Sequence, residues 1–412
     1  MLLKKEKISF EHYTSTGYEF NEEEINRKYE AGELRIVTEH GRYPLQNIRE
    51  ILGKNIDFDP NYQRRRIWSN RQKSRLIESF IMNVPVPPVF LYEVQYSRYE
   101  VMDGLQRLSS LYEFYTDKLK LSGLSEWREL NGLKYSQLPE QVRRGIDRRY
   151  ISTIVVLKET AKTKEEELML KTYVFERLNT GGTRLTPQET RNALYDGPMN
   201  VLTKTIAQKC NILHTLWSIK PLKQSDLIND DLFDEMDFDY EEKENQKNVL
   251  IRMEDVELVL RYFAYRQIHE NPAKGVKDLL DLYLRKANET YDQVTLRNLE
   301  LIFYEVLEFA NKLLGKNAFC MYTQNKNGSF SWKKRPSKLI YDPLMYVLSD
   351  YVHKATEKNY LLIEKKKFKT LLENLLETKV RDFNGRNNNR GDVIRRITLF
   401  RDLFEEVLLN CK

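Results

Sequence analysis

Three short segments of the chain combine residue types that bind phosphate groups. The first runs from Tyr62 to Trp68 and places three consecutive arginines between aromatic residues. Guanidinium groups bind phosphate oxygens through paired hydrogen bonds, while neighbouring aromatic rings pack or stack. Arg71, Lys73 and Arg75 extend the basic character into the residues that follow. The alternative is a solvated basic turn whose aromatic residues anchor it to a core.

The second segment, Asp103 to Arg107, reads Asp-Gly-Leu-Gln-Arg between a predicted strand and a predicted helix. Gly104 permits a tight backbone turn, and the start of the helix offers free N–H groups to a phosphate. Arg107 would clamp the anion, Asp103 would bind a metal ion or polarise a water, and Gln106 would orient that water. The alternative is a simple turn in which Asp103 caps the helix.

The third segment, Phe175 to Thr186, contains a loop with two glycines between two predicted helices. Its polar residues and glycines can present hydroxyl and amide groups to a phosphate, although no GxxxxGK[ST] sequence occurs in the chain. A capping box explains Thr186 and Glu189 structurally, so an ordinary helix–loop–helix turn is the alternative. The capping box does not account for Asn179, Thr180 or Arg184.

Composition limits the remaining chemistry. The 412 residues carry a net charge of only +6, so any affinity for nucleic acid must come from local basic patches. The three cysteines and five histidines are widely separated, which argues against a disulfide framework and a zinc site. No apolar run is long enough to span a membrane, and the first ten residues lack a secretory signal. We therefore expect a soluble, cytoplasmic protein.

The order of predicted elements divides the chain into a mixed and a helical part. We expect a polar helical arm over 1–35, a short strand over 35–37 and a helix over 44–52. Helices follow over 69–82 and 165–178, and strands over 89–92, 99–102 and 151–157. Thr186, Pro187 and Glu189 mark the start of a further helix.

From about residue 197 the pattern is helical throughout. The predicted helices cover 199–209, 249–269, 276–288, 293–314, 338–355, 360–378 and 390–410. Residues 225–247 hold 10 acidic and 2 basic side chains. They are expected to form an exposed loop, with a metal site or a nucleic-acid mimic as the alternative. The fold class is therefore α+β, with an α+β domain over 1–198 and an all-α domain over 199–412.

The order and spacing of the three segments resemble the ParB/sulfiredoxin-like domain at the N-terminus of GmrSD-type restriction endonucleases. The resemblance covers about residues 40–195. It is carried by the Tyr-Gln-Arg and Trp residues of 62–68, the proline-rich strand start at 84–88, the DGQQR-like turn at 103–107 and the FxxLNTxGxxLTxxE block at 175–189. Leu105 replaces a glutamine of the DGQQR motif and would face the core.

The resemblance implies a protein that binds and hydrolyses a nucleoside triphosphate (ATP, GTP or CTP, with Mg²⁺ as a candidate ion) in a DNA restriction or phage-defence system. Asp103, Gln106 and Arg107 are the candidate catalytic residues, and no metal site built from the protein alone is expected. The candidate nucleotide-binding residues are Gln63, Arg64, Gly104, Arg177, Asn179, Thr180, Gly181, Gly182 and Arg184. Two alternatives remain: a nucleotide- or DNA-dependent binding switch without turnover, and a nuclease that pairs Asp103 with Glu100 or Glu189.

Relatives commonly join this domain to an HNH nuclease. After residue 200 the chain has only His214, His269 and His353, and none lies in an HNH pattern. An HNH mechanism needs a histidine base beside its metal ligands, so we expect none here. The expected partners are therefore DNA and a separate nuclease protein, with a homodimer as a further expectation from the ParB-like relatives.

Basic clusters at 365–369 and 379–401 add a candidate DNA surface near the end of the chain. Lysine and arginine side chains bind the DNA backbone without reading its sequence. A solvated helix face is the alternative. The candidate DNA-binding residues are Arg65, Arg66, Arg386, Arg390, Arg395 and Arg396.

Overall fold

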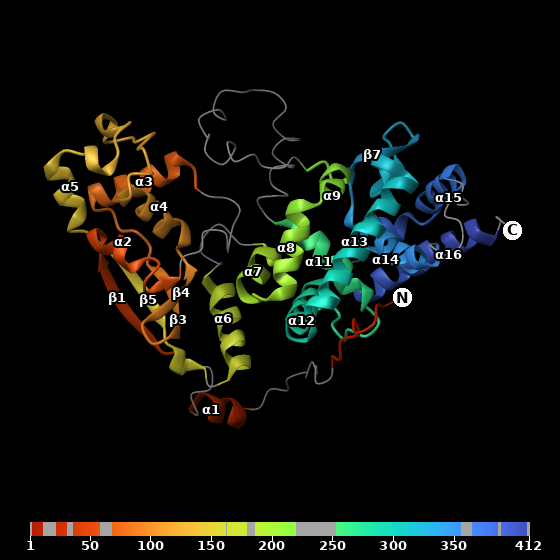
Figure 1. Ribbon diagram of the computed structural model, residues 1–412, viewed down its shortest axis with the longest axis horizontal. Helices are drawn as coiled ribbons and strands as arrows, with labels where there is room; N and C mark the ends of the chain where they lie inside the picture. Colours follow the sequence, from red (N-terminus) through yellow and green to blue (C-terminus); the bar gives the residue numbers. More distant parts are fainter. Residues whose placement is uncertain are drawn as a thin grey trace. The chain divides into compact units, whose positions relative to one another are not determined.

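Five strands of the computed structural model form one mixed sheet, in the order β1-β5-β3-β4-β2 (Figure 1). Their bounds are Thr38–Pro44 (β1), Ile56–Asp57 (β2), Val89–Gln95 (β3), Arg98–Asp103 (β4) and Tyr150–Val156 (β5). Strand β5 is antiparallel to β1 and parallel to β3, whereas β4 is antiparallel to β3 and parallel to β2. The structure describes residues 2–10, 22–30, 36–57, 68–161, 163–178, 186–219, 253–355, 365–385 and 389–409.

The register brings distant parts of the sequence to one end of the sheet. Asp103, the last residue of β4, is paired with Phe90 near the start of β3. Arg42, near the end of β1, lies opposite Ser152 near the start of β5. The β3–β4 hairpin closes at the other end of these strands, where Arg98 begins β4. The Asp103 turn and the starts of β3 and β5 therefore share one end of the sheet.

Alternation along the strands separates the two faces of the sheet. Leu91, Val101 and Val155 belong to a core that includes residues of four helices, namely α2 (Ile48–Ile51), α3 (Asn70–Met82), α4 (Leu105–Tyr115) and α5 (Glu140–Asp147). Tyr92 and Glu100 alternate with these core residues and contact α6 (Lys164–Leu178) instead. The four helices thus pack on one face and α6 on the opposite face. A further helix, α1, spans Glu22–Glu30.

Lys171 fixes α6 to the sheet. Its Nζ lies 2.8 Å from Oε2 of Glu100 and 4.5 Å from the ring centroid of Tyr92, and it also pairs with Glu167 on its own helix. Burial by itself would lower the pKa of Lys171, but the two carboxylates raise it above its ordinary value. Burial and the surrounding carboxylates also raise the pKa of Tyr92 to about 12. The Lys171 ammonium group therefore stays protonated at neutral pH.

Helix α3 begins and ends as its sequence predicts. The Ser69 hydroxyl accepts a hydrogen bond from the Gln72 amide at 3.1 Å, and the Gln72 side chain accepts one from the Ser69 amide at 3.0 Å. This reciprocal pair is a capping box. At the other end Asn83 adopts a left-handed conformation, and the Val84 amide donates to the Ser79 carbonyl at 2.8 Å. These bonds direct the chain toward Pro85 and strand β3.

The second compact unit is helical and contains residues 2–10 together with the described residues from Arg191 onward. The boundary between the two compact units falls between Thr190 and Arg191, inside helix α7 (Pro187–Leu194). The unit's other helices are α8 (Pro198–Lys209), α9 (Asn211–Leu216), α11 (Glu254–Arg266), α12 (Val276–Thr290), α13 (Gln293–Leu314), α14 (Lys338–Ala355), α15 (Lys365–Thr378) and α16 (Arg390–Leu409).

The first residues of the chain pack into the helical unit. Glu6 is fully buried, and its carboxylate pairs with Arg266 of α11 at 2.6 Å. The Ile8 amide donates to the side chain of Gln267 at 2.9 Å. The expectation that the whole segment 1–35 is a polar arm of the first domain is therefore wrong for residues 2–10.

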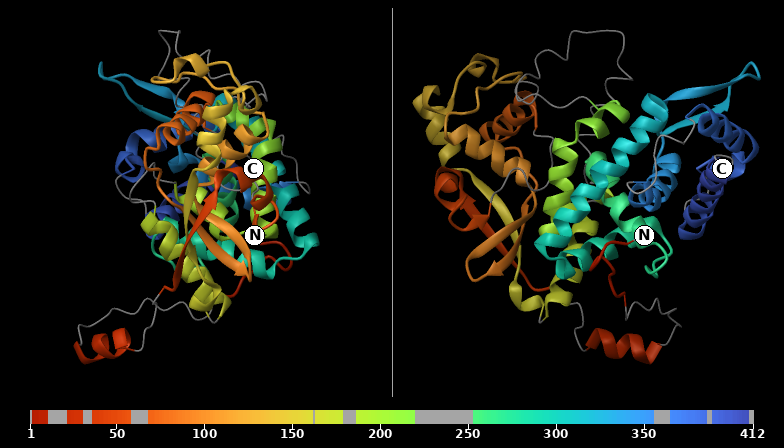
Figure 2. Two further views of the ribbon diagram at one scale, coloured as in Figure 1. Left: turned by 90° about the vertical axis from the view of Figure 1, so that its left-hand side faces the viewer. Right: turned by 45° about the vertical axis from the view of Figure 1, so that its right-hand side comes forward.

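A β-hairpin interrupts the helices where the sequence predicts none. Strands β6 (Cys320–Gln324) and β7 (Phe330–Pro336) pair antiparallel and extend from the helical unit (Figure 2). The rings of Tyr322 and Trp332 lie 5.3 Å apart across the pair, and the Trp332 indole donates to Glu373 of α15 at 2.6 Å. The expectation of an all-helical second domain is therefore corrected.

Smaller differences concern the start of the mixed unit. Strand β1 begins at Thr38, after the expected strand over 35–37. Residues 45–51 form a 3₁₀ turn followed by a single helical turn instead of one helix over 44–52. The acidic stretch 225–247 lies outside the described residues. Within the part of the chain that the structure describes, each helix is too short or too polar to cross a membrane.

Candidate functional site

The Asp103–Arg107 turn joins β4 directly to α4. Gly104 has a φ of +99°, a left-handed conformation that favours glycine. A Cβ atom at this position would lie 2.8 Å from Cγ2 of the buried Val89 and 2.9 Å from Nη2 of Arg107. Leu105 is buried in the core, as expected for the position that departs from the family motif. Both the backbone and the packing therefore require glycine at residue 104.

Arg107 is held across the turn by two oxygen atoms. Its Nη2 donates to Oδ2 of Asp103 at 2.6 Å and to the carbonyl oxygen of Pro88 at 3.2 Å. The Arg107 side chain is 15% exposed, whereas that of Asp103 is 52% exposed. Nε of Arg107 is buried and has no hydrogen-bond partner among the described residues. The cation is thus fixed in place, and the carboxylate is the accessible member of the pair.

Gln106 connects the turn to Trp68, which directly precedes the N-cap residue of α3. Its Oε1 accepts a hydrogen bond from the Trp68 amide at 2.9 Å. Trp68 is the last residue of the arginine-rich segment, so this bond fixes the end of that segment beside the turn. The nucleotide-binding candidates Gln63 and Arg64 and the DNA-binding candidates Arg65 and Arg66 lie outside the described residues.

The first turn of α4 presents backbone donors beside this ion pair. The first hydrogen bond inside the helix runs from the Leu108 amide to the Gly104 carbonyl, and no side chain caps the helix. The amides of residues 105–107 therefore have no partner within the helix. Such donors at the positive end of a helix dipole bind anions, and the Arg107 guanidinium adds to the attraction.

The glycine-containing loop is described only at its edges. Arg177 lies at the end of α6, where its guanidinium carbon is 5.4 Å from the Tyr173 ring centroid. Asn179, Thr180, Gly181, Gly182 and Arg184 lie outside the described residues. After the loop, the Thr186 amide donates to Glu189 at 2.6 Å and the Glu189 amide to the Thr186 hydroxyl at 3.2 Å. The predicted capping box is confirmed, and the nucleotide-binding role of the loop stays a prediction.

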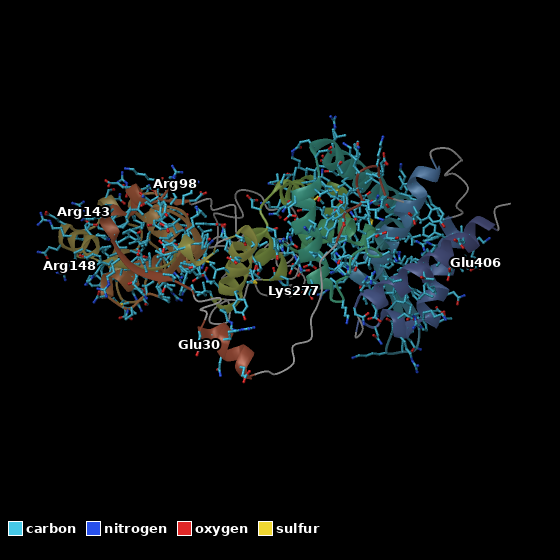
Figure 3. The ribbon with its side chains drawn as sticks, turned by 90° about the horizontal axis from the view of Figure 1, so that it is seen from below. Glu30, Arg98, Arg143, Arg148, Lys277 and Glu406 are labelled. Carbon is cyan, nitrogen blue, oxygen red and sulfur yellow. The ribbon has the colours of Figure 1, made fainter. Side chains whose placement is uncertain are left out.

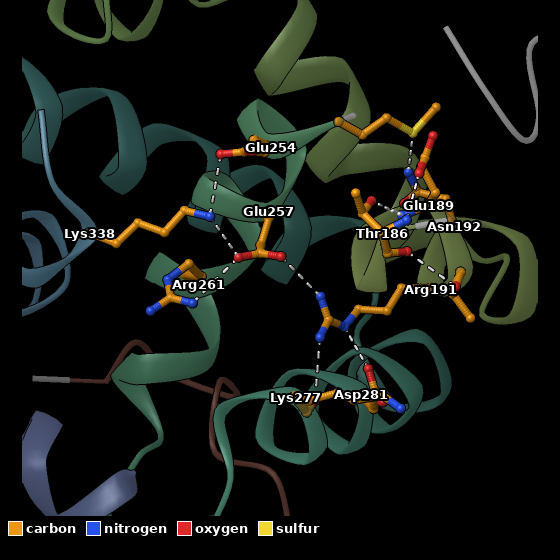
Figure 4. A network of polar contacts seen from close by, with 12 residues as sticks. Thr186, Glu189, Arg191, Asn192, Glu254, Glu257, Arg261, Lys277, Asp281 and Lys338 are labelled. Atoms are coloured by element: carbon orange, nitrogen blue, oxygen red, sulfur yellow. Dashed lines mark hydrogen bonds and ion pairs between the residues drawn. The ribbon is translucent and has the colours of Figure 1, made fainter. Parts of the chain in front are cut away.

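Helix α7 continues from this capping box into the core of the helical unit. Arg191 is buried and pairs with Asp281 of α12 at 2.5 Å and with Glu257 of α11 at 3.4 Å (Figure 4). Glu257 also accepts from Arg261 and Lys338, which lower its pKa although burial alone would raise it. The last helix of the motif-bearing segment is therefore anchored by a buried ion-pair network.

The candidate DNA-binding arginines near the end of the chain have mainly structural contacts. Arg390 donates to the carbonyl oxygens of Ile268 and His269 at 2.7 and 2.8 Å. Arg395 is 70% exposed and pairs with Asp382. Arg396 is only 1% exposed, and its Nη1 donates to the Asp382 carbonyl. A buried guanidinium cannot reach a DNA phosphate, so Arg396 is removed from the predicted set. Arg386 lies outside the described residues.

One group of basic residues was not predicted from the sequence to form a site. Arg42, Arg148 and Arg149 line a cavity of about 400 Å³ in the α/β unit. The available signal was the sequence Arg-Arg-Gly-Ile-Asp-Arg-Arg over 143–149, which places two arginine pairs directly before β5. Figure 3 shows Arg143 and Arg148 at the same end of this unit, apart from Arg98.

The α/β unit is thus a mixed sheet whose strand–glycine–helix turn positions an arginine and a carboxylate beside uncapped amides. Residues 48–195 match the family model of the GmrSD restriction endonuclease N-terminal domain. The matched segment contains all three sequence motifs, so the match supports for residues 48–195 the family that these motifs predict. No curated protein and no solved structure matches the chain.

Proposed function

We propose that the α/β unit binds a nucleoside triphosphate at the Asp103–Arg107 turn, within a DNA restriction or phage-defence system. The family match of residues 48–195 supports a role in a DNA restriction or phage-defence system. The position of Arg107 supports the ligand: the Pro88 carbonyl holds its guanidinium beside the uncapped first turn of α4. A guanidinium next to free helix amides forms a site for phosphate oxygens.

The Asp103 carboxylate would compete with a phosphate for Arg107. It is hydrogen-bonded to the guanidinium that the phosphate would need. A triphosphate therefore has to displace Asp103, whose side chain is half exposed to solvent. Mg²⁺ bound to the triphosphate would stabilise the displaced carboxylate, because Mg²⁺ prefers carboxylate, phosphate and water oxygens. Among the described residues no three His, Cys, Asp or Glu side chains form a metal cluster, so phosphates and water would supply the other ligands.

Hydrolysis is the favoured activity. In this proposal Arg107 stabilises the charge that develops on the phosphate oxygens, and Gln106 positions the attacking water. The Oε1 atom of Gln106 is engaged by the Trp68 amide, which leaves its Nε2 group to donate to a phosphate oxygen or to the water.

A binding switch without turnover is the second candidate. The observation that favours it is the set of contacts made by the same residues: Gln106 holds Trp68 and Arg107 holds Pro88. A ligand that changes these partners would move the segments before α3 and β3. The nuclease alternative is weaker, because Glu100 is paired with Lys171 and Glu189 caps its own helix.

The wider assignment follows the family. We propose a ParB/sulfiredoxin-like fold for the mixed unit, a cytoplasmic location, and DNA and a separate nuclease protein as partners. A homodimer fits the switch form of the proposal. Sedimentation of the full chain with and without nucleotide tests this last point, since a switch that dimerises predicts a nucleotide-dependent change in mass.

Phosphate release from ATP, GTP and CTP tests the activity. The full chain with Mg²⁺ is expected to release phosphate, and Asp103→Ala and Arg107→Ala are each expected to abolish release while the thermal unfolding midpoint stays within a few degrees. Arg98→Ala removes an exposed arginine of the same unit and serves as the matched control. Nucleotide binding without phosphate release, with and without DNA, would favour the switch. The absence of both nucleotide binding and phosphate release would refute both forms of the proposal.

A further inference from the structure

The cavity lined by Arg42, Arg148 and Arg149 lies within the α/β unit, on residues distinct from those of the Asp103–Arg107 turn. It has a volume of about 400 Å³ and is formed by the end of β1, the residues after α3 and the start of β5. Arg42 and Ser152 are opposite each other in the β1–β5 ladder, so their side chains lie on the same face of the sheet. The Arg149 carbonyl accepts from the Leu45 amide at 2.9 Å, which fixes the segment before β5 against the end of β1.

Among the residues that the structure describes, no carboxylate balances the positive charge of this cavity. No described carboxylate lies within 4 Å of the guanidinium groups of Arg42, Arg148 and Arg149, and Nε of Arg149 is buried without a partner among the described residues. Arg144, in the preceding helix α5, shows the contrast, since it pairs with Glu140 at 2.6 Å. A buried guanidinium N–H without an acceptor is costly, which makes an anionic ligand favourable.

The nearest acid in the sequence is turned to other partners. Asp147 directly precedes Arg148, yet its carboxylate accepts from the Tyr135 hydroxyl at 2.9 and 3.0 Å and from the Tyr115 hydroxyl at 3.1 Å. Burial, together with the nearby Asp147 carboxylate and its hydrogen bond, raises the pKa of Tyr115 strongly. Asp147 is therefore directed at two tyrosines and not at the two arginines that follow it.

The remaining walls provide apolar and aromatic surface. Tyr150 is 56% exposed and Val84 is 47% exposed, which is high for residues of this type, and both line the cavity with Pro85 and Val86. Proteins that bind single strands combine cations for the backbone with exposed rings on which bases stack. A volume of about 400 Å³ exceeds what a single phosphate group needs.

We propose that this cavity binds a nucleic-acid strand, with its phosphates on Arg42, Arg148 and Arg149 and a base against Tyr150. The ligand class is single-stranded DNA, including a strand opened from a duplex. This inference does not rest on the proposed nucleotide site, because the residues of the Asp103–Arg107 turn do not line the cavity.

The proposal is tested by titrating the full chain with a fluorescent 20-nucleotide single strand, the same sequence as a duplex, and inorganic tripolyphosphate. The double variant Arg42→Ala/Arg148→Ala is expected to weaken single-strand binding about tenfold or more and to reduce the slope of log affinity against log salt by roughly 1 to 1.5. Tyr150→Ala is expected to weaken single-strand binding about tenfold and duplex binding much less.

Controls separate this site from the nucleotide site. Arg98→Ala removes an exposed arginine at the other end of the sheet and is expected to leave single-strand affinity unchanged. Unchanged single-strand binding by the double variant, with native circular dichroism, would overturn the proposal. Loss of tripolyphosphate binding by the double variant, with retained single-strand binding, would also overturn the proposal. That result would assign the cavity to a free phosphate ligand.

Discussion

Nη2 of Arg107 lies 2.6 Å from Oδ2 of Asp103, four residues earlier, at the point where β4 passes into α4. The arginine is mostly buried and also bound to the Pro88 carbonyl, whereas the carboxylate is half exposed. Asp103 can therefore leave this contact more easily than Arg107 can. In the proposed phosphate site, the Asp103 carboxylate occupies the position that a phosphate would take.

Replacing Asp103 by Asn separates binding from hydrolysis. Without the carboxylate, a phosphate no longer competes for Arg107, so Asp103→Asn is expected to bind triphosphate in the absence of Mg²⁺ at least as tightly as the wild type. Phosphate release should fall about 100-fold or more, because the candidate ligand of Mg²⁺ is lost. Calorimetry and a phosphate assay on the same preparation provide the two measurements. Undiminished release would contradict the role given to Asp103.

Gly104→Ala is expected to destabilise the protein by about 1 to 3 kcal/mol. The cost arises because alanine is strained at a φ of +99° and its Cβ would press against Val89. Gly145→Ala is the matched control, since it lies inside α5 with no atom within 4 Å of the added Cβ. That substitution is expected to stabilise the protein by about 0.5 to 1 kcal/mol. Denaturant unfolding compares the two variants, and equal effects would contradict the packing described at the turn.

The buried network around Glu257 predicts a pH-dependent stability. Burial alone would raise the pKa of Glu257, but Lys338, Arg261 and Arg191 lower it below its ordinary value. The stabilisation is therefore complete above the unfolded-state pKa and is lost as pH falls through the lower folded-state pKa.

Glu257→Gln should accordingly cost about 2 kcal/mol at pH 7, as for other hydrogen bonds to charged groups. The difference from the wild type should shrink as the pH falls through the folded-state pKa of Glu257, which lies below its ordinary value. Urea unfolding at pH 7 and pH 3 measures this. A difference that grows as pH falls would contradict the assigned direction of the pKa shift.

Local signals in the sequence predicted local structure well. The Ser69–Gln72 and Thr186–Glu189 pairs mark helix starts, because each bond joins residues three positions apart. The Asp103–Arg107 turn was equally predictable, since Gly104 lies between a strand pattern and a helix pattern. In these places the residues that decide the structure are neighbours in the chain.

Features that depend on distant residues were not predictable in this way. Glu6 is 260 residues from its partner Arg266, and Arg42 lies opposite Ser152 only through the strand order. The arginine-rich end of the chain looked like a DNA surface because sequence does not show that Arg396 is buried. The β6–β7 hairpin was missed because its Tyr322 and Trp332 pack on α15 and not on a second sheet.

The central claim is that Arg107 binds the phosphates of a nucleotide. It is tested most directly by calorimetric titration of the wild type, Arg107→Ala and Arg98→Ala with non-hydrolysable ATP, GTP and CTP analogues. The structure predicts that the wild type and Arg98→Ala bind at least one analogue with equal affinity and that Arg107→Ala binds it at least tenfold more weakly. Equal affinity of Arg107→Ala and the wild type, or no binding of any analogue by the wild type, would contradict it.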